Sequence, residues 1–256
     1  MPKPYAPPTD ILFSNGFDGS KGHVHVATEM AQAHNVLIRG LNAIVQQAPH
    51  VPDSSSSSYK EQDVKDLLAY SSSWVKMVHH HHDVEEKYIF PEVDTITGQS
   101  GVMNEPKDQH ELFQPGLDSL TTYTATVKPS DHKWEGHGGM KEIFDSFSKC
   151  LVDHLYAEVD FILSLEHIGD AMAKAFAKGE DVAQKVGSLD TLYDLFPVVL
   201  GCADKTYGGG NTFPPVPWVM PYLVKYWFAY GNGAWRFNPS DWWGQPRPLY
   251  WTGQPK

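Results

Sequence analysis

The sequence has 256 residues, enough to bury a large hydrophobic core, and a formal net charge of −11. Its Lys and Arg residues form no cluster, which argues against a nucleic-acid partner or an anionic membrane partner. No stretch approaches the roughly 18–20 apolar residues of a membrane span, and the N-terminus lacks the apolar core of a signal peptide. Because Cys150 and Cys202 also show no metal-binding spacing, we expect a reducing, cytoplasmic location.

Composition divides the chain into three regions. Residues 1–22 are rich in Pro, Gly, Ser and Asp and predict an irregular N-terminal arm. Residues 23–168 carry helical patterns, and residues 169–256 predict short helices followed by a Trp- and Pro-rich tail. Six of the eight tryptophans follow residue 217. We expect this tail to pack over the preceding domain as an aromatic strap; the alternative is that it forms the wall of a pocket near a functional site.

Apolar residues recur at alternating steps of three and four in four segments, as they do in amphipathic helices. The segments span about 23–47, 61–90, 104–127 and 140–167. Loops rich in Pro, Ser or Gly separate them at 48–58, 91–103 and 128–139. The pattern therefore predicts an all-α, up-down-up-down four-helix bundle.

A run of four histidines and three acidic residues lies near the end of the second segment, from His79 to Glu86. The apolar stripe of this segment passes through His81 and Glu85, which lie about 40° apart on one helix face and can reach one metal ion. His79 and its neighbour His80 fall off the stripe and are interpreted as solvated. An ionised carboxylate facing the core needs a partner, so the register favours a bound cation.

The apolar stripe of each of the three remaining segments also carries a histidine. The fourth segment repeats the His–Glu pair at a spacing of four. The candidate metal ligands are His34, His81, Glu85, His110, His154 and Glu158. One histidine on an apolar stripe is usually a core residue, but four in four consecutive helices are not expected of a plain hydrophobic core. In the predicted topology they converge at one level. Six ligands exceed the four of a closed zinc site, and imidazoles with two carboxylates suit a dinuclear iron site.

The motifs that carry these residues resemble the hemerythrin-like (HHE cation-binding) domain proteins. They are HNVLIRGL around His34, HHDVEEKYIFP from His81, DQHELFQPGL around His110 and DHLYAEVDFIL around His154. The resemblance covers about residues 24–167, and the tail motifs FPPVPW and AWRF resemble fungal members. It implies a four-helix bundle that holds an oxo- or hydroxo-bridged pair of iron ions, with the same six residues as ligands.

One position departs from the oxygen-carrying hemerythrins, which have a second histidine one turn after the third-helix histidine. Here that position is Gln114. The candidate replacements are His82, Glu111 and the loop residues His132 and His137, and water is the remaining alternative. His82 is preferred because some hemerythrin-like domains use the residue after the second-helix histidine. An additional open position would favour O2 activation over reversible O2 carriage.

Two functions are compatible with such a centre. The first is an O2-dependent di-iron oxidoreductase that oxidises a small organic substrate under the aromatic tail, which a simple carrier would not need. The alternative is a non-enzymatic protein that binds or senses O2, NO or iron. Storage or detoxification of iron or peroxide, and a purely structural metal, are further alternatives. A ferritin-like site is disfavoured because it requires Glu-x-x-His, whereas this sequence has His-x-x-x-Glu.

Overall fold

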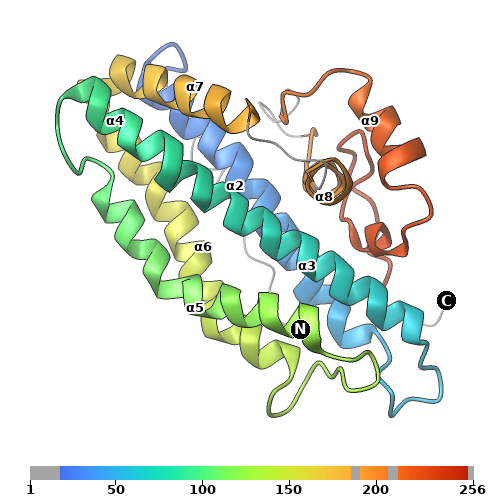
Figure 1. Cartoon of the computed structure of the whole chain (residues 1–256). Helices are drawn as coiled ribbons and strands as arrows, with labels where there is room; N and C mark the ends of the chain where they lie inside the picture. The colour runs from blue at the N-terminus through green and yellow to red at the C-terminus, as the bar shows by residue number, and fades with distance from the viewer. Residues whose placement is uncertain (1–17, 186–190, 207–212, 253–256) are drawn as a thin grey trace.

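The computed structural model describes residues 18–185, 191–206 and 213–252, apart from the side chains of residues 183–185 and 191. Most of the predicted N-terminal arm therefore lies outside the described residues. Four long helices form an antiparallel bundle (Figure 1). They are α2 (Gly22–Gln47), α3 (Glu61–Val84), α5 (Asn104–Thr126) and α6 (Met140–Ser164). The predicted all-α four-helix bundle is confirmed, and the described residues contain no β-strand.

The second helix of the bundle extends further than the sequence predicted. Instead of ending at Pro91, α3 continues through a π-helical segment, η2 (Glu85–Ile89), into α4 (Phe90–Thr97). The wider π turn bonds the Phe90 amide to the carbonyl oxygen of Glu85, five residues earlier. Pro91 then occupies the first turn of α4, where no amide hydrogen is required. The chain leaves the helix only at Gly98, whose φ of +66° is left-handed.

The C-terminal extension adds shorter helices along one side of the bundle (Figure 1). These are α7 (Gly169–Lys185), η4 (Thr191–Leu195), α8 (Phe196–Cys202), α9 (Met220–Leu223), η6 (Val224–Phe228) and η7 (Gly233–Phe237). Two short 3-10 turns, η1 (Ala48–His50) and η3 (Glu166–Ile168), follow α2 and α6. None of the helices in the described ranges has the length and apolar character needed to cross a bilayer.

The buried apolar side chains form two clusters that are separated along the bundle axis. On α2 one cluster ends at Ala31 and the other begins at Val36. On the second helix the same gap falls between Val78 and Ile89. We call the space between the two clusters the polar layer, because the candidate ligands of α2 and α3 lie in these gaps. The core is therefore interrupted at the level where the sequence placed a metal site.

The described part of the aromatic tail packs on the bundle at a distance from the polar layer. Trp235 and Phe237 contact Tyr70, with ring centroids 6.4 and 5.7 Å apart. Arg236 forms ion pairs with Asp63 and Asp66 of α3, at 2.9 and 2.7 Å. Tyr70 precedes the histidine run by about three helical turns, roughly 16 Å along the axis. These residues thus form a strap over the bundle rather than a wall beside the candidate ligands.

Helices α5 and α6 pack closely because α5 has a glycine at the contact. A Cβ atom at Gly116 would lie 2.5 Å from the Cβ of Phe147 and 2.7 Å from a carbon of its ring. Pro115, just before it, removes one helical hydrogen bond, yet α5 continues to Thr126. The Pro–Gly pair therefore lies within a helix, and Gly116 permits the close approach of α6.

We predict that Gly116→Ala destabilises the protein by about 1–3 kcal/mol, because overpacking outweighs the better helix propensity of alanine. Urea denaturation would measure the change in the free energy of unfolding. Thr122→Ala, at an exposed position of the same helix, is the matched control and should cause little loss. Equal stability of the Gly116→Ala variant and the parent chain would contradict this account of the contact.

Candidate metal centre

Seven side chains from the four helices converge in the polar layer. They are His34 of α2, His81 and His82 of α3, Glu85 at the start of η2, His110 of α5, and His154 and Glu158 of α6. They form two groups, one of His82, His110 and His154 and one of His34, His81, Glu85 and Glu158. Within each group the potential ligand atoms lie within 4.8 Å of one another.

The group of His34, His81, Glu85 and Glu158 has the spacing of ligands around one ion. The Nε2 atoms of His34 and His81 lie 3.0 Å apart. Two nitrogen ligands at about 2.1 Å from a metal, at right angles, would also be separated by about 3 Å. Glu85 Oε1 lies 3.1 Å from His81 Nε2, and Glu158 Oε2 lies 3.4 Å from His34 Nε2. Two imidazoles and two carboxylates thus face one point.

The two carboxylates connect this group to the other one. The second oxygen of Glu85, Oε2, lies 3.8 Å from His110 Nε2. Glu158 Oε2 lies 3.7 Å from His154 Nε2. Each carboxylate is therefore placed between histidines of both groups, Glu85 through its two oxygens and Glu158 through Oε2 alone.

Most of the atoms that face the layer have no hydrogen-bond partner among the described residues. These are both oxygens of Glu85 and of Glu158, both ring nitrogens of His82, and Nε2 of His110 and of His154. A buried polar atom without a partner costs about 1–3 kcal/mol, and a charged one more. Metal ions would give these lone pairs a partner, so the donor set fits a metal centre.

Contacts outside the layer orient three of the imidazoles. In each, Nδ1 donates to an oxygen: Leu155 O for His34 (2.7 Å), Glu86 Oε1 for His110 (2.7 Å) and Gln109 Oε1 for His154 (3.1 Å). A ring that donates through Nδ1 keeps the lone pair of Nε2 available for a metal. The outer hydrogen bonds therefore select the tautomer that a ligand requires.

The environment keeps three of the imidazoles neutral, those of His81, His82 and His154. Burial, reinforced by the neighbouring histidines, lowers the pKa of His81 and of His82 well below the usual value. Burial likewise lowers the pKa of His154 to about 3. Only neutral imidazole binds a metal, so these side chains need not lose a proton at neutral pH when a metal binds.

The two carboxyl groups differ in their response to the same layer. Burial, together with the charge of Glu158, raises the pKa of Glu85 well above its usual value. Burial also opposes ionisation of Glu158, but the imidazoles of His34, whose Nε2 lies 3.4 Å from Oε2, and of His154 lower its pKa overall. A cation bound between the two carboxylates would offset their mutual repulsion.

The structure brings His82 into the layer, although the predicted stripe followed only its neighbour. His82 lies four residues after the buried Val78, and residues four apart share a helix face. An apolar face somewhat wider than the predicted stripe therefore includes His82. Gln114, at the departure from the oxygen carriers, points elsewhere: its amide donates to Asp118 at 2.9 Å. The spacing of four from Val78 could have identified His82, but the strict alternation of steps of three and four left it out.

The other residues considered from the sequence lie outside both groups. Glu111 and His80 are exposed, and His137 has a fully exposed side chain. His79 lies at the edge of the bundle, 3.2 Å from the hydroxyl of Thr121. His132 is buried in the loop after α5, with Nδ1 3.0 Å from the hydroxyl of Tyr123.

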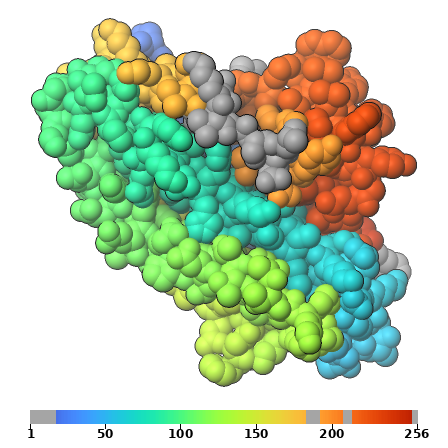
Figure 2. Space-filling view, in the orientation of Figure 1, coloured from blue at the N-terminus to red at the C-terminus, as the bar shows by residue number. Residues whose placement is uncertain are grey.

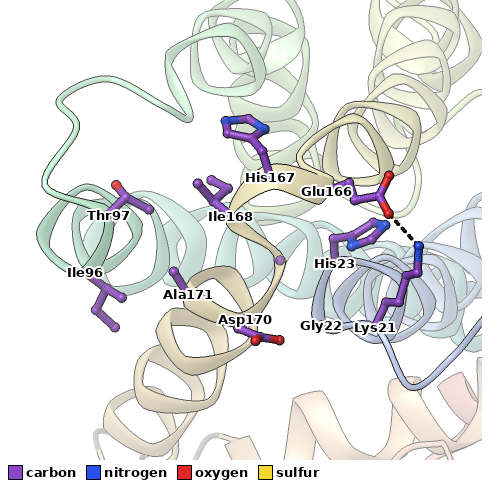
Figure 3. Close-up of a pocket in the computed structure, with 11 residues that line it drawn as sticks. Lys21, Gly22, His23, Ile96, Thr97, Glu166, His167, Ile168, Asp170 and Ala171 are labelled. Carbon is purple, nitrogen blue, oxygen red and sulfur yellow. Dashed lines mark hydrogen bonds and ion pairs between the residues drawn. The ribbon is translucent and has the colours of Figure 1, made fainter.

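A separate hollow of about 450 Å³ opens near the start of α2 (Figure 3). Lys21 and Glu166 form an ion pair beside it, 2.5 Å apart, and Ile96 and Thr97 of α4 lie across from them. His23, which also lines the hollow, precedes the α2 ligand by about three turns, roughly 16 Å. The hollow is therefore distinct from the polar layer.

Comparison with known proteins gives the same domain. The family model for the hemerythrin HHE cation binding domain matches residues 25–163. A curated relative from Cryptosporiopsis sp. (strain 8999), "Dimeric xanthone biosynthesis cluster protein R11", is 38% identical over 229 residues, covering 88% of this chain and 82% of the relative. No solved structure matches. The family model spans the four helices and all seven side chains of the polar layer, and the chain belongs to the hemerythrin HHE cation-binding domain family.

Proposed function

We propose that this chain is a non-heme di-iron protein that activates O2 and oxidises a small organic substrate. The observation that carries the proposal is the position of Glu85 and Glu158, each facing histidines of both groups. Paired carboxylates that bridge two ions are typical of dinuclear iron sites in helix bundles. Imidazole and carboxylate together also suit iron among the common transition metals.

In the proposed centre, both ions would share Glu85 and Glu158, and the histidines would divide between them. His34 and His81 would hold one ion, while His82, His110 and His154 would hold the other. His82 supplies the third imidazole that Gln114 does not, so the centre need not lack a ligand at that position. An open position would then lie on the ion held by two histidines, which would have four protein ligands.

Access to the centre also differs between its two sides. The side chain of His81 is 16% exposed, whereas those of His110 and His154 in the other group are 5 and 1% exposed. The side with two histidines therefore reaches the surface at His81, and there O2 and a small substrate would approach. On the other side Phe113 lies against His82, with ring centroids 5.0 Å apart, and excludes water.

When bound, a reduced iron pair would supply the electrons for reduction of O2, while the chain would position the reactants and shield them from water. The relative's name favours oxidation of an organic compound over O2 carriage, because that name places it in a biosynthesis cluster. The alternative is a non-enzymatic protein that binds or senses O2, NO or iron. It shares the metal centre and differs in what happens after O2 binds.

Anaerobic loading with ferrous iron followed by O2 tests the proposal. We expect about two irons per chain and a charge-transfer absorption band that decays faster when a substrate is present. Phenolic and polycyclic aromatic compounds are the first substrates to screen. A band that persists and disappears on removing O2 would identify a carrier instead. Binding of a single zinc ion and no iron would overturn the di-iron centre.

We predict that Glu85→Ala and Glu158→Ala each reduce bound iron from about two to one or fewer per chain, because each removes a bridge. Metal analysis after gel filtration measures the loss, and circular dichroism verifies that the helices persist. His79→Ala is the matched control, since His79 belongs to the same histidine run but contacts Thr121 outside the layer. Loss of iron in that control would mean that the ligand assignment on α3 is wrong.

Glu86 is a positioning residue for this centre. It accepts a hydrogen bond from Nδ1 of His110 at 2.7 Å, and its other oxygen lies 3.9 Å from the ammonium of Lys107. The imidazoles of His34 and His154 donate to neutral oxygens instead. A carboxylate partner makes an imidazole a stronger electron donor to its metal, so His110 should bind its ion more tightly than a neutral partner would allow.

We predict that Glu86→Gln keeps the hydrogen bond to His110 but loses the negative charge. Its affinity for iron, measured against a chelator, should fall by about tenfold or more. Chelator competition measures this effect without reference to enzymatic activity. Glu111→Gln is the control, because Glu111 is an exposed carboxylate adjacent to His110 in sequence and outside both groups. Equal iron retention by both variants would show that the charge of Glu86 has no such role.

A further inference from the structure

A surface of exposed aromatic side chains lies on the C-terminal extension. Figures 1 and 2 show α9 and its surroundings at the edge of the molecule, set off from the four-helix bundle. Trp218 is 82% exposed, Trp227 70% and Tyr230 79%. We define the aromatic surface as Trp218, Tyr222, Leu223, Tyr226, Trp227 and Tyr230, all of which are exposed. So many large apolar side chains gathered on one short segment mark an interaction surface.

The segment is apolar on its inner side as well. Pro221, Val224 and Ala229 are buried, and Phe228 packs edge-on against Tyr193 with ring centroids 5.2 Å apart. These inward residues attach the segment to the rest of the extension. The outward residues are not required for that attachment, so their apolar character needs another explanation.

The charge of this region differs from that of the rest of the chain. The sequence contains no Asp or Glu between Lys205 and Ser240, although the chain has 31 of these residues. Lys225 projects beside the aromatic surface, with its ammonium 5.1 Å from the ring centroids of Tyr226 and of Trp243. A protein of net charge −11 thus presents here an aromatic face with a cation and no anion from this stretch of sequence.

We propose that the aromatic surface docks the protein on a zwitterionic lipid bilayer. Trp and Tyr prefer the headgroup region, where the ring is buried and the polar tip stays hydrated, and a lysine beside them can reach phosphate. The side chains of Trp218 and Tyr230 project into solvent, and a bilayer accepts projecting side chains without a matching pocket. This contact is peripheral and does not rest on the iron centre.

Charge favours this occupant over two others. Two copies of the chain, each of net charge −11, repel one another as they approach. A strongly anionic bilayer repels the protein in the same way, whereas a zwitterionic bilayer has no net charge. Docking should therefore depend mainly on apolar burial and weaken little as salt is raised.

Vesicle flotation of the full-length protein with phosphatidylcholine vesicles tests this proposal. We expect the protein to float with the vesicles in both low and high salt. The double variant Trp218→Ser/Trp227→Ser should lose affinity for the vesicles by about tenfold or more, since two large rings no longer enter the interface. Lys225→Glu, which replaces the cation near the lipid phosphates by an anion, should also weaken binding.

Leu112→Ser is the matched control, because Leu112 is an apolar residue of α5 that is 67% exposed and lies outside the aromatic surface. It should float like the parent chain. Absence of parent-chain flotation would overturn the proposal, and so would equal flotation of the double variant. A parent dimer in light scattering that the double variant converts to a monomer would also overturn it, by identifying the surface as a contact between copies.

Discussion

The rest of the structure depends on a layer of carboxylates and imidazoles enclosed in an apolar bundle. Glu85 and Glu158 are each 1% exposed, and their oxygens lack hydrogen-bond partners among the described residues. Leaving such groups without a counter-charge is among the costliest arrangements in a protein interior. The bundle must therefore be stable enough to hold the ligands in place and must also provide a cation site that offsets their cost.

The two apolar clusters, together with the extension, meet the first requirement. Beyond the layer on one side, Met172 and Phe176 of α7 complete the cluster around Met30 and Phe90. On the other side, Trp235 belongs to the larger cluster formed by the bundle helices and the tail. The extension thus reinforces both ends of the bundle. The layer is confined between two packed regions, which limits how far the helices can shift around it.

The helical stripes were predictable because burial imposes a period near 3.6 residues, and the same period placed His34, His110, His154 and Glu158 on the core face. The strict alternation of three and four led to His81 alone, although His82 is more deeply buried. The continuation past Pro91 was not predictable from propensity, since proline normally ends a helix unless a wider turn precedes it. The place where the tail packs on the bundle was also not predictable from the sequence, because its tryptophans follow no period and its contacts are with residues distant in the chain.

The π segment has a consequence for how the centre communicates with solvent. A π turn is equivalent to one extra residue in a helix, and here it begins with two consecutive glutamates. Glu85 Oε2 faces Nε2 of His110, and Glu86 Oε1 accepts from Nδ1 of the same ring. Two consecutive glutamates thus lie on either side of the His110 ring, and only Glu86 is hydrogen-bonded to it. One of them is sealed inside the bundle, while the side chain of Glu86 is 33% exposed. A change of charge at the partly exposed Glu86 would therefore alter the electrostatic potential at this buried imidazole without a helix having to move.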